Sequence, residues 1–310
     1  MDKILIFGAS GFIGLNLVKK LSSFNNFIIT GTYLNNKPRV ELPNVTFLKI
    51  NLTKYLEMKN KIQEADFIIH LAADRDPFLG GKSGINQINK NQLITENISK
   101  LAKKIKCKKM IYISSAYIYS GTRDKRFKEN SFLDPKESLG KSKLLCEKIL
   151  KNYSSKNYFK CISFRLFTVY GNGASDKQFV EIAIKKIKSK LNSINFGNGS
   201  IKRDMIYIDD VTNGIYLSIL NFKKINKIYL PINLGYGRSL KIESIVNMIC
   251  KGLKIKKKIS YNENNSRIGD NDHLCNISLL ENIFKWKPET TFRSGLLKMM
   301  NERLKIGNKI

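Results

Sequence analysis

The stretch Lys3-Ile-Leu-Ile-Phe-Gly8-Ala-Ser-Gly11-Phe-Ile-Gly14, followed by residues 15–21, decides the fold of this chain. The apolar run before Gly8 predicts a buried strand, and apolar residues at every fourth position after Gly11 predict a helix. Gly8 permits the turn between them, Gly11 lets backbone N–H groups approach a pyrophosphate, and Gly14 lets the helix pack closely on the strand. The stretch therefore predicts a dinucleotide site. The alternative is a plain strand-to-helix turn, because the spacing G-x-x-G-x-x-G differs from G-x-G-x-x-G.

Length and cysteine usage narrow the class of protein. A chain of 310 residues can bury a full α/β core with a smaller lobe beside it. It runs from Met1 straight into an apolar strand, and no apolar run reaches the length of a membrane span, so we expect a soluble cytoplasmic protein without membrane insertion. The cysteines are odd in number and never spaced C-x-x-C, which predicts neither a disulfide framework nor a metal site. They are Cys107, Cys146, Cys161, Cys250 and Cys275.

The net charge is strongly positive, with 55 Lys and Arg residues against 25 Asp and Glu, a balance of +30. Such a charge fits nucleic acid, an anionic membrane surface, or a composition that has drifted toward lysine. The basic clusters at 103–109, 185–190 and 254–258 are dispersed and lack interleaved aromatic residues. Lysine also abounds together with asparagine and isoleucine, so we favour compositional drift and expect no specific nucleic-acid partner.

Strands and helices alternate along the first half of the chain, which predicts an α/β fold with a Rossmann-type, doubly wound parallel sheet. Later segments predict a strand at 228–234, a helix that ends at Leu220 with Asp209 and Asp210 as its N-cap, and otherwise short helices around loops. We expect a dinucleotide-binding domain of residues 1–171 plus about 205–237, and a smaller C-terminal substrate-binding lobe of about 172–204 plus 238–310. The other expected strands are 27–33, 45–51, 67–73, 110–114 and 160–167, and the other expected helices are 55–65, 88–105, 140–153, 179–191, 240–253, 279–284 and 292–304.

An ordered series of short motifs follows the same path. On these motifs the chain resembles the extended short-chain dehydrogenase/reductase family, whose members are NAD-dependent nucleotide-sugar epimerases, dehydratases and ketoreductases, over nearly its whole length. The motifs are Gly8-Ala-Ser-Gly-Phe-Ile-Gly14, His70-Leu-Ala-Ala73, Asn91-x-x-x-Thr95-x-Asn97, Ile113-Ser-Ser-Ala116, Gly140-Lys-Ser-Lys143, Arg165-Leu-Phe-Thr-Val-Tyr-Gly171, Arg203-Asp-Met-Ile-Tyr-Ile-Asp-Asp210, Arg267-Ile-Gly-Asp270 and Trp286-Lys-Pro288.

The resemblance implies a site for NADP or NAD. Lys143 would bind the nicotinamide ribose hydroxyls, and Asn51 would lie near the adenine, where the family usually has Asp. We predict a preference for NADPH, because NAD enzymes place an acidic residue at the end of the second strand and here Lys37 and Arg39 follow it. The alternative is that Asn35 serves NAD. The implied cofactor residues are Gly8, Ser10, Gly11, Phe12, Ile13, Gly14, Lys37, Arg39, Asn51, Leu52, Leu71, Ala72, Ala73, Asn91 and Lys143.

The resemblance also implies a nucleotide-sugar substrate, bound between the sheet and the C-terminal lobe, and a homodimer. Arg203 and Arg267 would meet the substrate diphosphate, and either could instead be a surface ion pair. Phe196 would stack on the base. Thr168 stands where the family usually has an Asn that contacts the substrate phosphate.

The chain departs from the family at its catalytic residue. The motif Tyr-x-x-x-Lys ends at Lys143, and Leu139 occupies the tyrosine position. If residues 115–117 are extended, Tyr117 and Ser115 point to the same side, so the Tyr117 phenol could be the acid/base with Ser115 donating a hydrogen bond. The alternative is that Tyr117 only fills space. Ala116 and Tyr117 also replace the Asp-Glu pair of the 4,6-dehydratases, which argues against dehydration.

Three functions remain in competition. The first is an enzyme that reduces or epimerises a nucleotide-linked sugar, with Lys143, Ser115 and Tyr117 as catalytic residues, in the synthesis of a surface glycan. The second is a catalytically silent cofactor-binding protein of the same fold, for which Leu139 is the main support. The third, a basic nucleic-acid binder, rests only on the charge.

Overall fold

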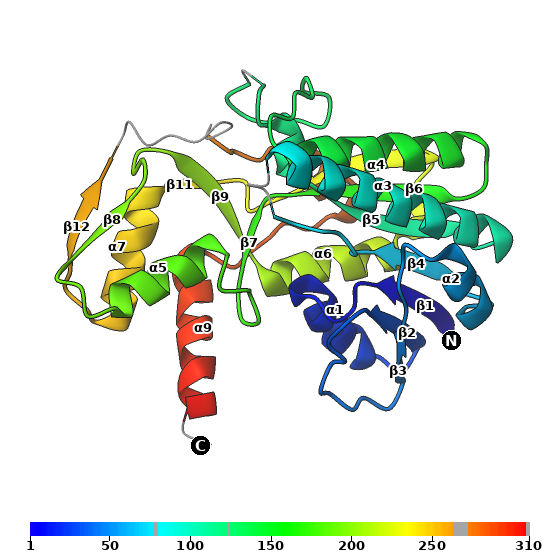
Figure 1. The fold of residues 1–310 in the computed structure, drawn as a ribbon, viewed down its shortest axis with the longest axis horizontal. Helices are drawn as coiled ribbons and strands as arrows, with labels where there is room; N and C mark the ends of the chain where they lie inside the picture. Colours follow the sequence, from blue (N-terminus) through cyan, green and yellow to red (C-terminus); the bar gives the residue numbers. More distant parts are fainter. Residues whose placement is uncertain (77–79, 123, 263–271, 308–310) are drawn as a thin grey trace. The chain divides into compact units, whose positions relative to one another are not determined.

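The computed structural model describes residues 1–76, 80–122, 124–262 and 272–307 (Figure 1). The chain forms two compact units, and each is described by itself. Unit 1 comprises Met1–Thr122, Phe132–Leu166 and Thr212–Ile232, and unit 2 comprises Arg123–Ser131, Phe167–Val211 and Asn233–Ile310.

A seven-stranded sheet forms the centre of unit 1, in the order β10-β6-β5-β4-β1-β2-β3 (Figure 1). Strand β1 pairs in parallel with β2 on one side and β4 on the other, with Ile4 opposite both Ile29 and Phe67. The parallel Rossmann-type sheet expected from the sequence is thereby confirmed. The strands are β1 (Asp2–Phe7), β2 (Phe27–Tyr33), β3 (Val45–Lys49), β4 (Phe67–His70), β5 (Lys109–Ser115), β6 (Lys160–Leu166) and β10 (Tyr229–Leu234).

Helices cover both faces of this sheet. On one face α2, α3 and α4 bury an apolar cluster that includes Met58, Ile98 and Leu150 against β1, β4 and β5. On the other face, Phe24 after α1 stacks on Tyr216 of α6 with ring centroids 4.4 Å apart. The bounds are α1 (Phe12–Ser22), α2 (Tyr55–Lys61), α3 (Gly81–Lys104), the 3₁₀ helix η1 (Ala116–Tyr119), α4 (Ser138–Ser155), α6 (Ile208–Leu220) and the 3₁₀ helix η2 (Phe222–Lys224).

Unit 2 contains two small sheets, of order β11-β9-β7 and β12-β8. The expectation of short helices around loops was therefore wrong for part of this region. In strand β8 the side chains of Ile194 and Phe196 are buried, and they alternate with two exposed polar residues. This pattern is too short to identify a strand from the sequence. The elements are β7 (Thr168–Tyr170), α5 (Phe179–Lys188), β8 (Ser193–Phe196), β9 (Lys202–Tyr207), β11 (Ser239–Lys241), α7 (Ile242–Leu253), β12 (Lys258–Tyr261), α8 (Ser278–Phe284) and α9 (Phe292–Gly307).

Two expected helix starts were wrong. Helix α3 begins at Gly81, seven residues before the expected position, because its first two turns are mostly polar and carry no apolar periodicity. Asp209 and Asp210 lie inside the first turn of α6 rather than at its N-cap. The Asp210 carboxylate instead accepts a hydrogen bond from the Thr290 N–H group, at 2.9 Å.

Candidate functional site

The glycine turn between β1 and α1 has no room for side chains at two of its three glycines. Gly8 has a φ of +84°, and a Cβ atom there would lie 2.9 Å from the Cα and N atoms of Ala72. A Cβ atom at Gly14 would lie 2.2 Å from the Gly8 carbonyl oxygen. At Gly11 the nearest neighbour is 3.4 Å away, an ordinary contact, so this position keeps backbone open to an approaching group.

The N-terminus of α1 meets the requirements of an anion site. No side chain caps the helix at Gly11, and its first turn contains no acidic residue. The N–H groups of Phe12 and Ile13 are among those that a helix leaves without intrahelical partners, and they carry the positive end of the helix dipole. Ser10 is exposed beside them. These residues fit a dinucleotide pyrophosphate.

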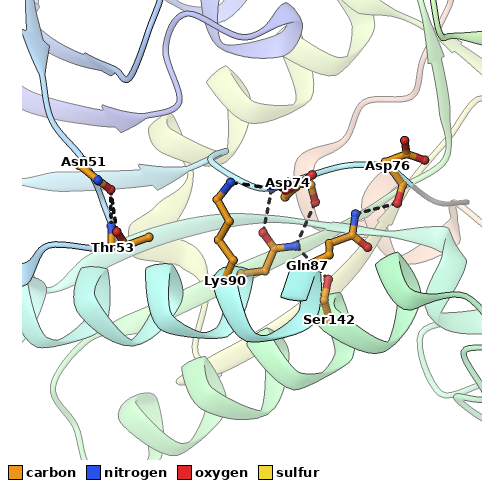
Figure 2. A network of polar contacts seen from close by, with 8 residues as sticks. Asn51, Thr53, Asp74, Asp76, Gln87, Lys90 and Ser142 are labelled. Carbon is orange, nitrogen blue, oxygen red and sulfur yellow. Dashed lines mark hydrogen bonds and ion pairs between the residues drawn. The ribbon is translucent and has the colours of Figure 1, made fainter. Parts of the chain in front are cut away.

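The loops after β2 and β3 contribute two kinds of polar side chain, cationic groups after β2 and a neutral amide after β3. Lys37 and Arg39 are exposed in the loop that follows β2. Asn51, after β3, uses its amide oxygen to accept from the Thr53 N–H group and hydroxyl, at 3.1 and 2.8 Å (Figure 2). The Asn51 amide can therefore present only its NH₂ group to a ligand, whereas an Asp would present an acceptor.

Asn91 on α3 holds the loop that follows β4. It accepts from the Asp74 N–H group at 2.8 Å and donates to the Asp74 carbonyl at 3.0 Å and to the Ser142 hydroxyl at 3.1 Å. Its side chain is 2% exposed. Because both polar atoms of the amide are engaged inside the protein, Asn91 positions the loop rather than offering a hydrogen bond to a cofactor.

A second side chain of α3 fixes the same loop two residues further on. Gln87 donates to the Asp76 carbonyl at 2.6 Å, and the Ser138 hydroxyl on α4 donates to the Gln87 amide oxygen at 2.7 Å. Lys90 forms a 3.5 Å ion pair with the Asp74 carboxylate (Figure 2). Gln87 and Ser138 were missed by the sequence analysis, since buried polar pairs leave no periodic signal.

Helix α3 therefore fixes the backbone on both sides of Arg75. The sequence motifs did not identify Arg75 as a candidate site residue. Its guanidinium has no hydrogen-bond or ion-pair partner within the part of the chain that the structure describes. The loop lowers the pKa of Arg75 by partial desolvation, yet the residue is exposed to solvent. A carboxylate nearby would oppose that decrease.

Leu139 and Lys143 lie one turn apart on α4 and are both buried, with Leu139 7% and Lys143 4% exposed. The Lys143 ammonium donates to the Ile113 carbonyl at 2.6 Å and lies 4.8 Å from the centre of the Tyr112 ring. Burial lowers the pKa of Lys143 to about 8; the positive charge of Arg75 adds to this decrease, and Cys146 and Glu147 oppose it.

The turn after β5 overturns one geometric expectation. Residues 115–117 are not extended, because β5 ends at Ser115 and the 3₁₀ helix η1 begins at Ala116. Ser115 is the N-cap of η1, and its hydroxyl accepts from the Tyr117 N–H group at 3.3 Å. The argument that strand alternation directs both side chains to one side was therefore wrong. Accepting this bond leaves the Ser115 hydroxyl proton available to donate.

His70, at the end of β4, is a packed structural residue, as its position in an apolar strand indicates. It is 1% exposed, and its Nε2 atom lies 3.0 Å from the Thr95 hydroxyl. That hydroxyl in turn donates to the Asn91 carbonyl at 2.9 Å. Burial, joined by the positive charge of Lys143, holds the pKa of His70 well below its usual range. The imidazole is therefore neutral and packs in the interior of unit 1.

The remaining cofactor residues lie close to the glycine turn. Leu71 donates its N–H group to the Phe7 carbonyl at 3.0 Å, and Ala72 touches Gly8, so the end of β4 runs beside the turn. Leu71, Ala72 and Ala73 are each partly exposed. Leu52 is also partly exposed, and its carbonyl accepts from Asn97 at 3.0 Å.

All four residues expected to bind substrate belong to unit 2, and three of them lie among the described residues. Phe196 is 4% exposed and packs beside Tyr261 and Phe179, so its ring has little open face for a base. Arg203 on β9 is partly exposed, and Thr168 begins β7 with a partly exposed side chain. Arg267 lies outside the described residues.

The described residues form neither a metal site nor a disulfide. No cluster of three or more His, Cys, Asp or Glu side chains is arranged to hold a metal ion. The five cysteines are unpaired. None of the helices traced in residues 1–307, leaving aside 77–79, 123 and 263–271, is long and apolar enough to cross a membrane.

The sequence pattern of the NAD dependent epimerase/dehydratase family matches residues 4–235, and the chain belongs to this family. It is 26% identical over 316 residues to a UDP-glucuronate 4-epimerase of Thermodesulfobacterium geofontis, covering 97% of this chain and 96% of the relative. It is also 26% identical over 310 residues to a dTDP-4-dehydro-6-deoxyglucose reductase of Escherichia coli, covering 96% of each. The resemblance inferred from the sequence motifs is thereby confirmed.

Solved structures agree on the fold. The UDP-glucuronic acid 4-epimerase from Bacillus cereus, in complex with UDP-glucuronic acid and NAD, superposes with a TM-score of 0.86 at 23% identity. The match covers 98% of this chain and 99% of the other.

Proposed function

We propose that the chain is an NAD(P)-dependent oxidoreductase or epimerase that acts at the 4-position of a nucleotide-linked sugar in the synthesis of a surface glycan. The observation that carries the proposal is the uncapped N-terminus of α1 behind the Gly8–Gly14 turn, joined to a buried Lys143 in the same unit. We place cofactor binding in unit 1, and we infer a cytoplasmic homodimer from the family.

The proposed cofactor contacts follow the geometry of unit 1. The N–H groups of Phe12 and Ile13 and the Ser10 hydroxyl would hold the pyrophosphate, and Leu71, Ala72 and Ala73 would line the dinucleotide. Lys143 would donate to the nicotinamide ribose. When bound, the nicotinamide ring supplies the group that accepts or returns a hydride.

The proposed substrate contacts belong to unit 2. Arg203 and Arg267 would bind the diphosphate, because a guanidinium donates two parallel hydrogen bonds to phosphate oxygens. Thr168 would contribute a hydroxyl. Phe196 would support the base only after its packing beside Tyr261 loosens.

The proton of the sugar hydroxyl needs a carrier, since Leu139 has no ionisable group. We propose Tyr117, with the Ser115 hydroxyl donating to the sugar oxygen and the Lys143 cation favouring the phenolate. If so, Tyr117→Phe lowers kcat at least about a hundredfold and leaves cofactor affinity unchanged. Full activity of Tyr117→Phe contradicts this role.

A specific observation favours a second candidate, a silent cofactor-binding protein. Leu139 is 7% exposed, so the position is filled by a packed aliphatic side chain. In that case the natural protein binds dinucleotide but shows no hydride transfer, and Leu139→Tyr gains turnover. Measuring hydride transfer in both proteins, together with the mass and absorbance of any copurified nucleotide, separates the two functions.

Within the cofactor class we propose a preference for NADPH. Lys37 and Arg39 are exposed in the loop after β2, where a 2′-phosphate would meet positive charge. Titration calorimetry should give tighter binding of NADPH than of NADH, and Lys37→Gln combined with Arg39→Gln should remove the difference. Tighter binding of NADH to the natural protein would refute the preference.

A further inference from the structure

Asp204 is a buried carboxylate in unit 2 that the proposed function does not use. It lies on β9 and is 0% exposed. Its Oδ1 atom accepts from the Tyr236 N–H group at 2.6 Å, and its Oδ2 atom accepts from the N–H groups of Gly237 and Cys275 at 2.9 and 3.3 Å. Burying a carboxylate carries a desolvation cost, which here is offset by three directional hydrogen bonds.

Arg126 binds two of the same residues through their carbonyl groups. Its Nη2 atom donates to the Gly237 carbonyl at 2.8 Å, and its Nε atom donates to the Cys275 carbonyl at 3.3 Å. Gly237 and Cys275 are therefore held twice, by an anion at their N–H groups and by a cation at their carbonyl groups. Burial raises the pKa of Asp204 to about 7, and the three N–H groups together with the charge of Arg126 oppose that increase.

The hydrogen bonds of Asp204 reach the neighbours of β9 on both of its edges. On one edge β11 pairs with β9, with Ser239 opposite Asp204, and the turn that the carboxylate holds leads into β11 (Figure 1). On the other edge Arg203 faces His273 in a parallel bridge, and Cys275 follows two residues later. The carboxylate therefore fixes the backbone of β9 between its two neighbours.

The turn before β11 is shaped around this carboxylate. A Cβ atom at Gly235 would lie 2.9 Å from Asp204 Oδ1 and 2.8 Å from the Cys275 Cβ atom. Gly237 has a φ of +84°, in the left-handed region that favours glycine. Both glycines let successive N–H groups of the turn converge on one anion.

Arg203 and Asp204 occupy opposite faces of β9, because successive side chains of a strand alternate. Asp204 is buried, whereas Arg203 is partly exposed. A change at Asp204 therefore reaches Arg203 through the backbone of the strand.

We propose that Asp204 is a positioning residue for the substrate. Its carboxylate, with Arg126 on the far side of the same residues, fixes β9 so that Arg203 meets the diphosphate of the nucleotide-linked sugar in one orientation. This inference rests on the proposed function, which places the diphosphate at Arg203. A strand fixed before binding spends less of its binding free energy on ordering.

Nucleotide binding to the full chain tests the role of Asp204. UDP and dTDP are the probes, because each presents a diphosphate without a sugar, and the tighter of the two is used. Asp204→Asn keeps the size of the side chain but turns an NH₂ group toward at least one N–H donor. With saturating dinucleotide, titration calorimetry should give a Kd for the probe at least about fivefold higher, with the Kd for dinucleotide unchanged.

A double-mutant cycle separates positioning from general support of the fold. Arg203→Gln should raise the Kd for the probe at least about tenfold, and adding Asp204→Asn should raise it further by less than about twofold. Arg126→Gln, at an exposed position, should reproduce the selective loss in a smaller degree without disturbing the core. Its control is Arg293→Gln, which removes the same charge from an exposed position on α9 and should change neither Kd.

Four results would overturn the role of Asp204. Asp204→Asn could leave the Kd for the probe unchanged, or weaken probe and dinucleotide by the same factor with a fall in Tm. It could also weaken the probe equally with and without Arg203, which would mean that it does not act through the guanidinium. If Asp204→Asn does not fold, an unchanged Kd in Arg126→Gln decides against the proposal. A natural protein that binds neither UDP nor dTDP would refute the proposed function itself.

Discussion

Glu147 lies one helical turn after Lys143, yet its carboxylate is bound by Arg165. Arg165 donates from Nη2 to Glu147 Oε2 at 2.8 Å and from Nε to Oε1 at 3.1 Å, and its Nη1 donates to the Tyr119 hydroxyl at 2.8 Å. Both charged side chains are 5% exposed. Burial lowers the pKa of Lys143 to about 8, and the charge of Glu147, which Arg165 engages, opposes that decrease only in part.

Breaking the Glu147–Arg165 ion pair should strongly destabilise the fold. Arg165→Met leaves the Glu147 carboxylate buried without its partner, and we expect the free energy of unfolding to fall by about 3 to 5 kcal/mol. Denaturant unfolding measures the change. The control is Lys61→Gln, which removes a solvent-exposed ion pair with Glu57 and should cost less than about 0.5 kcal/mol. A loss below about 1 kcal/mol in Arg165→Met would show that the pair is dispensable.

The two histidines of the chain should make the fold sensitive to acid. Burial holds the pKa of His70 well below its usual range and lowers that of His273 to about 3, with a further decrease from Arg203. The unfolded chain binds these protons near pH 6.5 and the folded chain does not. Above pH 6.5 both states carry neutral imidazoles, and the histidines do not reduce the free energy of unfolding. Below pH 6.5 each histidine lowers the free energy of unfolding by about 1.4 kcal/mol per pH unit.

The measurement is the free energy of unfolding from pH 7.5 to 4.5, compared with His70→Asn combined with His273→Asn. The difference between the two proteins should change by nearly 3 kcal/mol per pH unit below about pH 6. Parallel curves would mean that both imidazoles titrate normally in the folded protein.

The glycine turn predicts that stability and binding can be separated. Gly14→Ala should destabilise the fold, because its Cβ atom would lie 2.2 Å from the Gly8 carbonyl oxygen. Gly11→Ala should fold normally, since the nearest atom is 3.4 Å away, but should weaken dinucleotide binding at least about tenfold by obstructing the phosphate approach. Gly80→Ala, with nothing within 4 Å, is the control for both. Normal binding by Gly11→Ala would contradict the proposed pyrophosphate site.

Asn91→Ala should loosen the loop that carries Arg75. The substitution removes both hydrogen bonds to the Asp74 backbone, and we expect a loss of about 2 kcal/mol in stability. Hydrogen exchange at the Asp74 amide should accelerate by at least about tenfold. Asn60→Ala, at an exposed position on α2, should change neither quantity. An unchanged exchange rate would show that the loop is held by other contacts.

The sequence predicted those parts of the fold that depend on local periodicity. The apolar run of β1, the glycine turn and α1 form one continuous signal, and β2 was predicted with its observed bounds, Phe27–Tyr33. Strand β8 was missed because two inward apolar residues, Ile194 and Phe196, do not make a period. Its pairing with β12 joins residues more than sixty positions apart, which no local pattern reveals.

The candidate site was predictable only where a motif fixes backbone geometry. The three glycines of the turn could be identified from the sequence alone, without knowing which residues contact them. The bend at Ala116 was missed because a 3₁₀ turn of apolar residues resembles the end of a strand.

The position of β10 in the sheet has a consequence for synthesis of the chain. Strand β6 ends at Leu166, but its outer neighbour β10 begins at Tyr229, roughly 60 residues later. At translation rates of about 5 to 20 residues per second, the edge of β6 stays uncovered for roughly 3 to 12 seconds on the ribosome. An uncovered parallel edge is a template for intermolecular pairing. Nascent chains stalled between these strands should therefore be the species most prone to aggregate and the most dependent on chaperones.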